Sequence, residues 1–271
     1  MSLFRSALDR FGRSSPIAQL YRHQALENLK GSARYGDPRR LARYEHQSYS
    51  QGGEDGVIRE IFRRIGVESR TFVEIGVGDG LENNTALLLL DGWTGVWIEG
   101  NPKNCVAIRK HLAKWMETGE LHVIQCMVTA ENVDAVTRRR ASSASPDLLS
   151  IDVDRNTYHI WKALRGWSPR VVAIEYNATF PPDMNWVVDY DASKSWNGTS
   201  YFGASLKALE MLGTELGYHL VGCDLAGVNA FFVRKDLCGD RFCAPFSAEN
   251  HFEPIRYYLH GRVGHPRALS D

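Results

Sequence analysis

Acidic side chains and glycines stand together in the first third of this 271-residue sequence. Glu74 comes two residues before a glycine-rich stretch that contains Gly76 and Gly78. Glycines here let the backbone turn sharply and let a ligand approach the main chain without a Cβ in the way. A carboxylate just before them would repel a pyrophosphate and attract a cation. The pattern predicts a site for a cofactor that carries positive charge.

A second acid, Glu99, follows the glycines by about 20 residues, where an acid accepts hydrogen bonds from the ribose hydroxyls of an adenosine. Such an acid serves NAD and S-adenosylmethionine alike. Glu74 favours S-adenosylmethionine, because that cofactor has an ammonium and a sulfonium group. The alternative is a tight turn with solvated acids and no ligand.

Two further acidic groups, Asp152-Val-Asp154 and Glu175-Tyr-Asn177, each follow a short apolar run. Oxygen ligands clustered in this way suit Mg²⁺ or Mn²⁺. A divalent ion could hold two substrate hydroxyls and lower the pKa of one of them. We therefore predict a metal site from Asp152, Asp154, Glu175 and Asn177. The alternative is that the acids bind sugar hydroxyls directly, without a metal.

The same region offers candidates for a general base. We expect Asp152 to lie at the reaction centre, next to the cofactor. Asp154 and His159 are the nearest candidates for taking a proton, and histidine has the apt pKa. Asp154 could instead cap the helix that follows, and His159 could simply face solvent.

Short apolar runs alternate with helical patterns along the chain, which implies parallel strands joined by right-handed crossovers. The link at 224–227 is too short for a crossover helix and suits a hairpin. We predict an α/β fold with a doubly wound, mostly parallel seven-stranded sheet and a terminal antiparallel hairpin, as in class I methyltransferases. Strands are expected at 71–75, 95–99, 121–125, 148–152, 170–175, 218–223 and 228–233, and helices at 57–65, 87–90, 104–116 and 203–216.

The motifs SYSQGGEDG, FVEIGVGDGLENNT, GWTGVWIEGNP, SIDVDRNTYHIW and EYN occur in this order. Together they resemble the FkbM-type methyltransferases of glycan and natural-product gene clusters, from about residue 49 to residue 234. The resemblance implies methyl transfer from S-adenosylmethionine, usually to a hydroxyl of a sugar or similar small molecule. It also implies that Tyr49 and Gln51 lie in a loop that covers the cofactor, and that Asn83 and Thr85 lie near its methionine carboxylate.

The metal group is also similar to that of the catechol O-methyltransferases, in which an acid after the fourth strand and an Asp-Asn pair after the fifth bind the ion. Asp152 matches the first position, and Glu175 with Asn177 roughly matches the second. Arg155 stands where that group has a lysine, and an arginine cannot act as a general base.

A long segment at 180–205 lies between the fifth predicted strand and the next helix. It mixes aromatic residues, among them Trp186, Tyr190, Trp196 and Tyr201, with Asp and Asn. Loops of this length in a compact domain are usually functional or disordered. The aromatic rings are expected either to stack on a sugar ring or to fill the core beneath the loop.

The amino-acid composition narrows the classes of partner that we expect. The chain has 32 Lys+Arg and 32 Asp+Glu, so no general attraction to nucleic acid follows, and we expect a small-molecule or glycan acceptor. Five cysteines without a CxxC pair favour a cytoplasmic protein. No stretch is apolar enough to span a bilayer, although Phe4, Leu8, Phe11, Leu20 and Tyr21 could form a surface that touches a membrane or packs on the domain.

We divide the chain into a helical N-terminal extension (1–45), a cofactor-binding methyltransferase domain (46–237) and a C-terminal extension (238–271) that is a lid or an oligomer contact. The competing functions are an NAD-dependent oxidoreductase or epimerase, a metal-free natural-product methyltransferase and a non-catalytic scaffold. Against the first stand Glu74, the terminal hairpin and the absence of a Tyr-x-x-x-Lys pair.

Overall fold

A seven-stranded sheet organises the chain, with the strand order β3-β2-β1-β4-β5-β7-β6. The structure is a computed structural model that describes residues 16–259 and 267–269. Strand β7 runs antiparallel to both β5 and β6, and the other neighbouring pairs are parallel. The predicted doubly wound, mostly parallel sheet with its antiparallel end is confirmed. The strands are β1 (Thr71–Ile75), β2 (Thr94–Glu99), β3 (Leu121–Gln125), β4 (Leu148–Ile151), β5 (Val171–Glu175), β6 (Tyr218–Cys223) and β7 (Asn229–Arg234).

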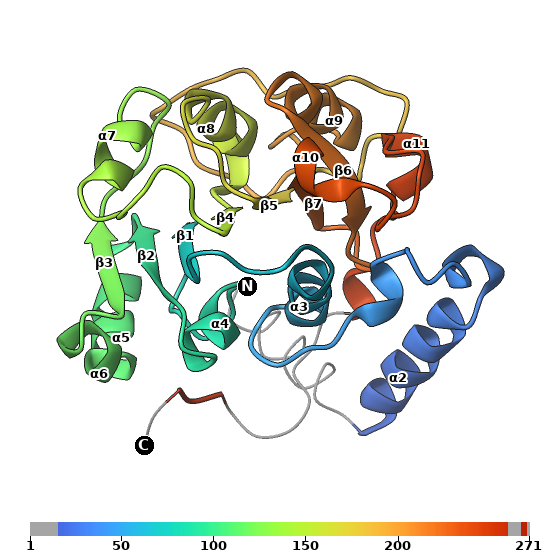
Figure 1. The fold of residues 1–271 in the computed structure, drawn as a ribbon, viewed down its shortest axis with the longest axis horizontal. Helices are drawn as coiled ribbons and strands as arrows, with labels where there is room; N and C mark the ends of the chain where they lie inside the picture. Colours follow the sequence, from blue (N-terminus) through green and yellow to red (C-terminus); the bar gives the residue numbers. More distant parts are fainter. Residues whose placement is uncertain (1–15, 260–266, 270–271) are drawn as a thin grey trace.

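Helices cover both faces of this sheet. Figure 1 shows α7, α8 and α9 along one face and α3, α4, α5 and α6 along the other. The α-helices are α2 (Pro16–Lys30), α3 (Glu54–Ile65), α4 (Ala86–Leu90), α5 (Pro102–His111), α6 (Ala113–Glu117), α7 (Val133–Arg138), α8 (Thr157–Ala163), α9 (Leu206–Glu215), α10 (Lys235–Cys238) and α11 (Ala248–His251). Short 3₁₀ turns are η1 (Ala33–Tyr35), η2 (Ala42–Tyr44), η3 (Asp154–Asn156) and η4 (Tyr257–Leu259).

Strand β1 shows why both faces need a cover. Successive side chains of a strand point to opposite faces. Phe72 joins the buried cluster that contains Ile58 of α3, whereas Val73 and Ile75 join the cluster that contains Leu209 of α9. A strand that is apolar on both faces is typical of a parallel sheet with helices on each side. Glu74, buried on the α3 face, is the polar exception.

One predicted helix has a different form in the structure, and short helices such as α7 were not predicted. The helix expected at 104–116 is two helices, α5 and α6, that meet at Leu112, whose ψ of 20° interrupts the helical backbone. Helix α7 was not predicted, because its six residues offer only a short apolar pattern. The strands lie within one residue of their predicted bounds, whereas α3 begins three residues before and α9 three residues after its predicted start.

Segments from both ends of the chain lie against the β6–β7 hairpin. Tyr35, Leu225 and Leu259 share a small buried cluster. Tyr35 Oη also donates to Glu253 Oε2 at 2.7 Å, and Tyr176 Oη donates to the Glu253 carbonyl at 2.6 Å. The boundaries near residues 45 and 237 stay predictions.

The predicted amphipathic surface is described only in part. Leu20 and Tyr21 are 66% and 74% exposed on α2. Phe4, Leu8 and Phe11 lie outside the described residues. Within the described residues, no helix has the length and apolar character needed to cross a bilayer.

Candidate functional site

A cavity of about 690 Å³ opens at the carboxyl-terminal edge of the sheet. Ligands of doubly wound folds bind at this edge, and small-molecule sites commonly measure about 300–1,000 Å³. Its walls come from the ends of β1, β2, β3 and β4 and from the segment between β5 and α9. Among the lining residues are Gln51, Gly76, Gly78, Asp79, Glu82, Glu99, Asn101, Met127, Asp152, Asp154, Asn156 and Lys194.

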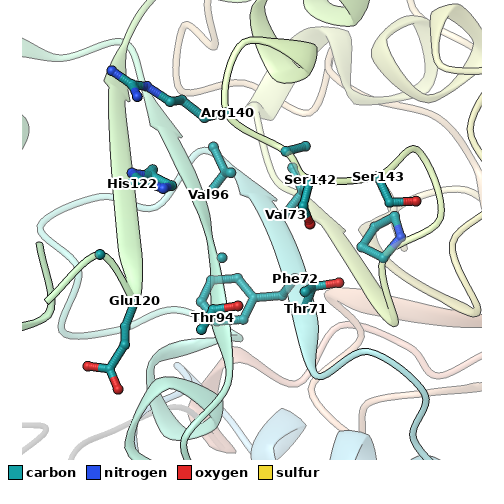
Figure 2. Close-up of a pocket in the computed structure, with 14 residues that line it drawn as sticks. Thr71, Phe72, Val73, Thr94, Val96, Glu120, His122, Arg140, Ser142 and Ser143 are labelled. Carbon is teal, nitrogen blue, oxygen red and sulfur yellow. The ribbon is translucent and has the colours of Figure 1, made fainter.

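The opposite edge of the sheet carries a much smaller hollow. Figure 2 shows this pocket beside Thr71, Phe72 and Thr94, near the starts of β1 and β2. Its volume is about 100 Å³, which is below the usual size of a small-molecule site. Of these two hollows, the one at the carboxyl edge has the volume of a small-molecule site.

The glycine-rich turn after β1 forms the floor of the larger cavity. Gly76 has a φ of +83°, and a Cβ there would lie 1.7 Å from the carbonyl oxygen of Asp152. Gly78 has a φ of +59°, and a Cβ there would meet no atom within 4 Å. The first glycine thus lets the turn touch the end of β4, and the second leaves open space on the cavity side.

Glu99 holds this turn from the end of β2. Its Oε2 accepts hydrogen bonds from the Val77 and Gly78 amides at 3.2 and 2.9 Å. Its Oε1 accepts from the Asn101 amide at 2.7 Å. A carboxylate has about four acceptor positions, so one remains for a ligand. The residue lines the cavity, and its contact with a ribose stays a prediction.

Glu74 lies behind the wall of the cavity and not on it. Its Oε2 accepts from Asn83 Nδ2 at 2.6 Å, from Thr85 Oγ1 at 2.5 Å and from the Thr85 amide at 3.2 Å. Its Oε1 accepts from the Asn84 amide at 2.9 Å and from Ser150 Oγ at 3.1 Å. Burial raises the pKa of Glu74, and the hydrogen bond from Thr85 is the largest opposing effect. Its carboxylate is occupied by five donors of this chain.

Asn83 and Thr85 therefore serve the loop that follows the glycines. Both are buried. Thr85 Oγ1 also accepts from the indole Nε1 of Trp97 at 2.7 Å. Together with Glu74, these side chains fix the start of α4 to the sheet. Neither is among the residues that line the cavity.

The negative charge of the cavity comes from residues other than Glu74. Five carboxylate residues and one lysine are among the lining residues, and they are Asp79, Glu82, Glu99, Asp152, Asp154 and Lys194. Such a wall attracts a cation and repels an anion. Sequence reasoning missed Asp79 and Glu82, although their place just after β1 was a usable signal. It also missed Lys194, for which the sequence carries no signal.

Three carboxylates converge where β4 and β5 end. One oxygen each of Asp152, Asp154 and Glu175 lies within 4.8 Å of the others. Within the described part of the chain, the buried Oε2 of Glu175 has no hydrogen-bond partner. Two oxygens bound to one Mg²⁺ at about 2.1 Å lie at most about 4.2 Å apart, so small side-chain rotations would bring all three onto one ion. The donor set and the spare oxygen fit a hard divalent cation.

The electrostatics of this cluster also favour a cation. Burial, followed by the charge of Asp154, raises the pKa of Asp152 to about 7. Burial and the neighbouring charge of Asp152 raise the pKa of Glu175 well above its ordinary value. At Asp154, which is exposed at the rim, partial desolvation of the carboxylate and the charge of Glu99 raise the pKa. A bound cation would offset this repulsion and keep the three groups ionised.

Two residues predicted for this cluster have other contacts. Asn177 Nδ2 donates to the carbonyl oxygens of Ser200 and Phe202 at 2.8 and 2.9 Å, and its Oδ1 accepts from the Thr179 amide at 3.1 Å. It therefore anchors the segment after β5. His159 Nε2 lies 2.8 Å from the Val188 carbonyl oxygen, and its ring contacts Tyr158 and Tyr190. Its ring is half-buried among these neighbours and lies outside the cavity lining, so its role as a base stays a prediction.

Asp154 stays at the rim of the cavity. It is exposed and has a φ of +57°, in the left-handed region that Asp tolerates better than most residues. The residue that precedes α8 is Asn156, and no side-chain cap is formed there. The alternative in which Asp154 caps this helix is therefore wrong.

Tyr49 and Gln51 lie in the loop before α3. Gln51 lines the cavity. Tyr49 is half-buried away from the cavity, and its Oη donates to the Ala268 carbonyl at 2.9 Å. The structure brings the loop to the cavity but places only one of the two side chains on its wall.

The long segment after β5 folds back over the Asp154–Asn156 turn. Arg155 donates to the carbonyl oxygens of Tyr201 and Asp189 at 3.3 and 3.2 Å. Asn156 Nδ2 donates to the Asp191 carbonyl at 3.0 Å. These contacts place Lys194 on the cavity wall.

The aromatic side chains of this segment form a partly exposed surface. Phe180 and Trp186 are stacked with ring centres 4.2 Å apart, and Tyr201 meets Trp186 edge-on at 5.5 Å. Trp196 is 50% exposed and Tyr201 is 47% exposed. The rings are therefore only partly used as core, and none of these four residues is among those that line the cavity.

Comparison with known proteins finds solved structures that resemble part of this chain. No protein-family model matches this chain, and no curated protein sequence matches it. The N-terminal domain of EvdMO1 with SAH bound is 13% identical, covering 70% of this chain and 80% of that one with a TM-score of 0.43. Precorrin-6y C5,15-methyltransferase from Geobacter metallireducens GS-15 is 15% identical, covering 70% and 93% with a TM-score of 0.42. An O-methyltransferase from Bacillus cereus in complex with SAH is 14% identical, covering 64% and 73% with a TM-score of 0.34.

Proposed function

We propose that this protein is an S-adenosylmethionine-dependent methyltransferase. The observation that carries the proposal is the cavity at the carboxyl edge of the sheet, whose wall has five carboxylate residues and one lysine. S-adenosylmethionine carries an ammonium and a sulfonium group, which such a wall attracts. NAD would bring a pyrophosphate to the same acids, so the oxidoreductase alternative is disfavoured.

Glu99 and the glycine-rich turn are the proposed adenosine and methionine sites. Glu99 has an acceptor position left for a ribose hydroxyl after its three main-chain hydrogen bonds. The open space above Gly78 leaves room for the methionine part. Glu82 and Asp79 are the acids that the ammonium group would meet on this wall. Glu74 then supports the site indirectly, by holding the loop that contains Asn83 and Thr85.

The proposed acceptor site is the cluster of Asp152, Asp154 and Glu175. These residues would hold Mg²⁺ or Mn²⁺, which when bound would lower the pKa of an acceptor hydroxyl. Asp154, exposed at the rim, is the group placed to take the hydroxyl proton. The methyl group passes from the sulfonium sulfur to the acceptor oxygen, so the S–CH₃ bond breaks as the O–CH₃ bond forms and S-adenosylhomocysteine leaves.

The proposed acceptor is a hydroxyl of a sugar or glycan. The half-exposed rings of Trp196 and Tyr201 give flat apolar faces, and Tyr201 Oη donates to Asp189 Oδ2 at 3.1 Å, a combination that suits the ring and hydroxyl groups of a sugar. The FkbM-type motifs of the sequence support the same class of acceptor. A cytoplasmic location belongs to this proposal as well.

Calorimetry with S-adenosylhomocysteine and with NAD⁺ tests the cofactor. We expect the first to bind at micromolar or lower concentration and the second at least tenfold more weakly. Tighter binding of NAD⁺ would support the oxidoreductase, and binding of neither would support a non-catalytic scaffold. Transfer of a labelled methyl group to a panel of sugars then tests the acceptor class.

The metal is tested separately. Mn²⁺ titration should give a saturable site in the wild type that weakens at least tenfold in Asp152→Asn. Asp183→Asn is the matched control, because Asp183 is an exposed acid of the long segment and lies outside the cluster. Full methyl transfer after exhaustive dialysis against EDTA would favour the metal-free alternative.

A further inference from the structure

Near the C-terminus, one arginine joins two loops that wall the cavity. The loop before α3 supplies Gln51 to the wall, and the turn after the glycines supplies Glu82. We propose that Arg267 is a positioning residue that braces these two loops for cofactor binding. The identity of the ligand rests on the proposed function, whereas the contacts of Arg267 do not depend on that function.

The contacts of the Arg267 guanidinium reach both loops at once. Nη1 donates to the Tyr49 carbonyl at 2.5 Å and to the Leu81 carbonyl at 3.2 Å, and Nη2 donates to the Ser50 carbonyl at 2.9 Å. Nη1 also lies 3.5 Å from Glu82 Oε1, and the arginine side chain is only 8% exposed. The charge is therefore largely removed from water and is compensated by these oxygens.

The residues next to Arg267 are anchored as well. Tyr49 Oη donates to the Ala268 carbonyl at 2.9 Å. Leu269 is buried in the cluster against which Tyr49 and Leu81 pack. The chain at 267–269 thus has both polar and apolar contacts with the two loops.

The loop before α3 is held from two sides by buried charges. Asp55 Oδ2 accepts from the amides of Ser48, Tyr49 and Ser50 at 2.7–2.8 Å. Arg267 takes the carbonyl oxygens of Tyr49 and Ser50. The donors and acceptors of this main chain are therefore fixed by a carboxylate on one side and a guanidinium on the other. Fixing the loop before binding lowers the ordering cost that a ligand must overcome.

An arginine suits this position because its planar group presents several N–H donors in a fixed arrangement. A lysine would keep the charge, but its ammonium is a compact point charge on a flexible stem and could not reproduce the same fork. The proposal therefore predicts a graded series in which the wild type binds best, Arg267→Lys is intermediate and Arg267→Ala is weakest.

The test measures binding of S-adenosylhomocysteine by calorimetry and the melting temperature of each variant. We expect Arg267→Ala to raise Kd about tenfold, the scale of losing hydrogen bonds made by a charged group. In turnover, KM for S-adenosylmethionine should rise while kcat at saturation changes less. Arg256→Ala is the matched control, because among the described residues its side chain donates to Glu253 and to the Leu225 carbonyl and makes no hydrogen bond to either loop. Equal effects of the two variants on Kd, or no effect of Arg267→Ala, would overturn the proposal.

A second measurement separates this inference from the proposed function. Amide hydrogen exchange without ligand should become faster at 48–52 and 81–84 in Arg267→Ala and stay unchanged there in Arg256→Ala. If the wild type binds no adenosyl cofactor but this exchange pattern is found, the brace holds and the proposed function fails. Unchanged exchange in both loops would reject the brace whatever the protein binds.

Discussion

Replacing Glu99 by Gln removes the charge of the carboxylate that joins β2 to the glycine-rich turn while keeping its size. Glu99 accepts hydrogen bonds from the amides of Val77, Gly78 and Asn101 and lines the cavity. A glutamine has one acceptor oxygen and an NH₂ group in place of the second oxygen. If its oxygen stays with Val77 and Gly78, the NH₂ group faces the Asn101 amide, and two donors oppose each other.

The size of the effect follows from these contacts. A buried donor without a partner costs about 1–3 kcal/mol, so the free energy of unfolding should fall by about this amount. The proposed bond from the ribose to a charged acceptor contributes about 1.5–3 kcal/mol. At 1.4 kcal/mol for each factor of ten, Kd for S-adenosylhomocysteine should rise about 10- to 150-fold in Glu99→Gln.

Calorimetry on folded protein gives Kd, and urea unfolding gives the stability change. Glu117→Gln is the control for the charge change, because Glu117 is exposed on α6 and lies outside the cavity lining. A Kd in Glu99→Gln within twofold of the wild type would refute the assignment of Glu99 to the ribose, even if the protein remains a methyltransferase.

Three further outcomes are expected. Burial raises the pKa of Glu45 from 4.5 to about 8. The folded protein then keeps a proton that the unfolded chain has lost, so stability falls as pH rises from about 5 to 8. Melting temperatures of Glu45→Gln should fall less over this range, and parallel curves would contradict the assignment. Gly76→Ala should cost several kcal/mol in urea unfolding, because its Cβ would lie 1.7 Å from the Asp152 carbonyl oxygen. Gly78→Ala should cost about 1 kcal/mol of backbone strain, because its Cβ would lie in open space. Equal losses of stability in the two variants would contradict this geometry. Trp196→Ala should raise KM for a sugar acceptor about 3- to 10-fold by loss of an aromatic contact. Its Kd for S-adenosylhomocysteine should stay within twofold, and an unchanged acceptor KM would remove Trp196 from the acceptor site.

The order of strands and helices could be predicted because the sequence patterns that indicate each of them are local. Buried parallel strands are short apolar runs, and the link at 224–227 is too short for a helix. Helix α7 escaped prediction because six residues give too little periodicity. The break between α5 and α6 at Leu112 was not predicted, because the apolar pattern continues through this residue although the helical backbone is interrupted there.

The sequence could predict at which edge of the sheet the candidate site lies. Glu99, Asp152 and Asp154 reach the cavity, because residues that follow parallel strands meet at one edge. Asn177 and His159 follow the same rule in sequence, but neighbouring carbonyl groups of the long segment take their side chains. Which hydrogen-bond partner these two side chains contact depends on the path of the long segment, and that segment has no local sequence pattern.

The sequence by itself determined the sheet, its antiparallel end and the positions of acids and glycines after the strands, since these depend on local periodicity and chain length. Only the tertiary structure decided which acids face the cavity. Glu74 has the charge expected of a ligand group, yet five donors from Asn83, Asn84, Thr85 and Ser150 enclose its carboxylate. The physical reason is that a buried carboxylate is stabilised by any set of nearby donors, and the sequence does not say whether those donors belong to the protein or to its ligand.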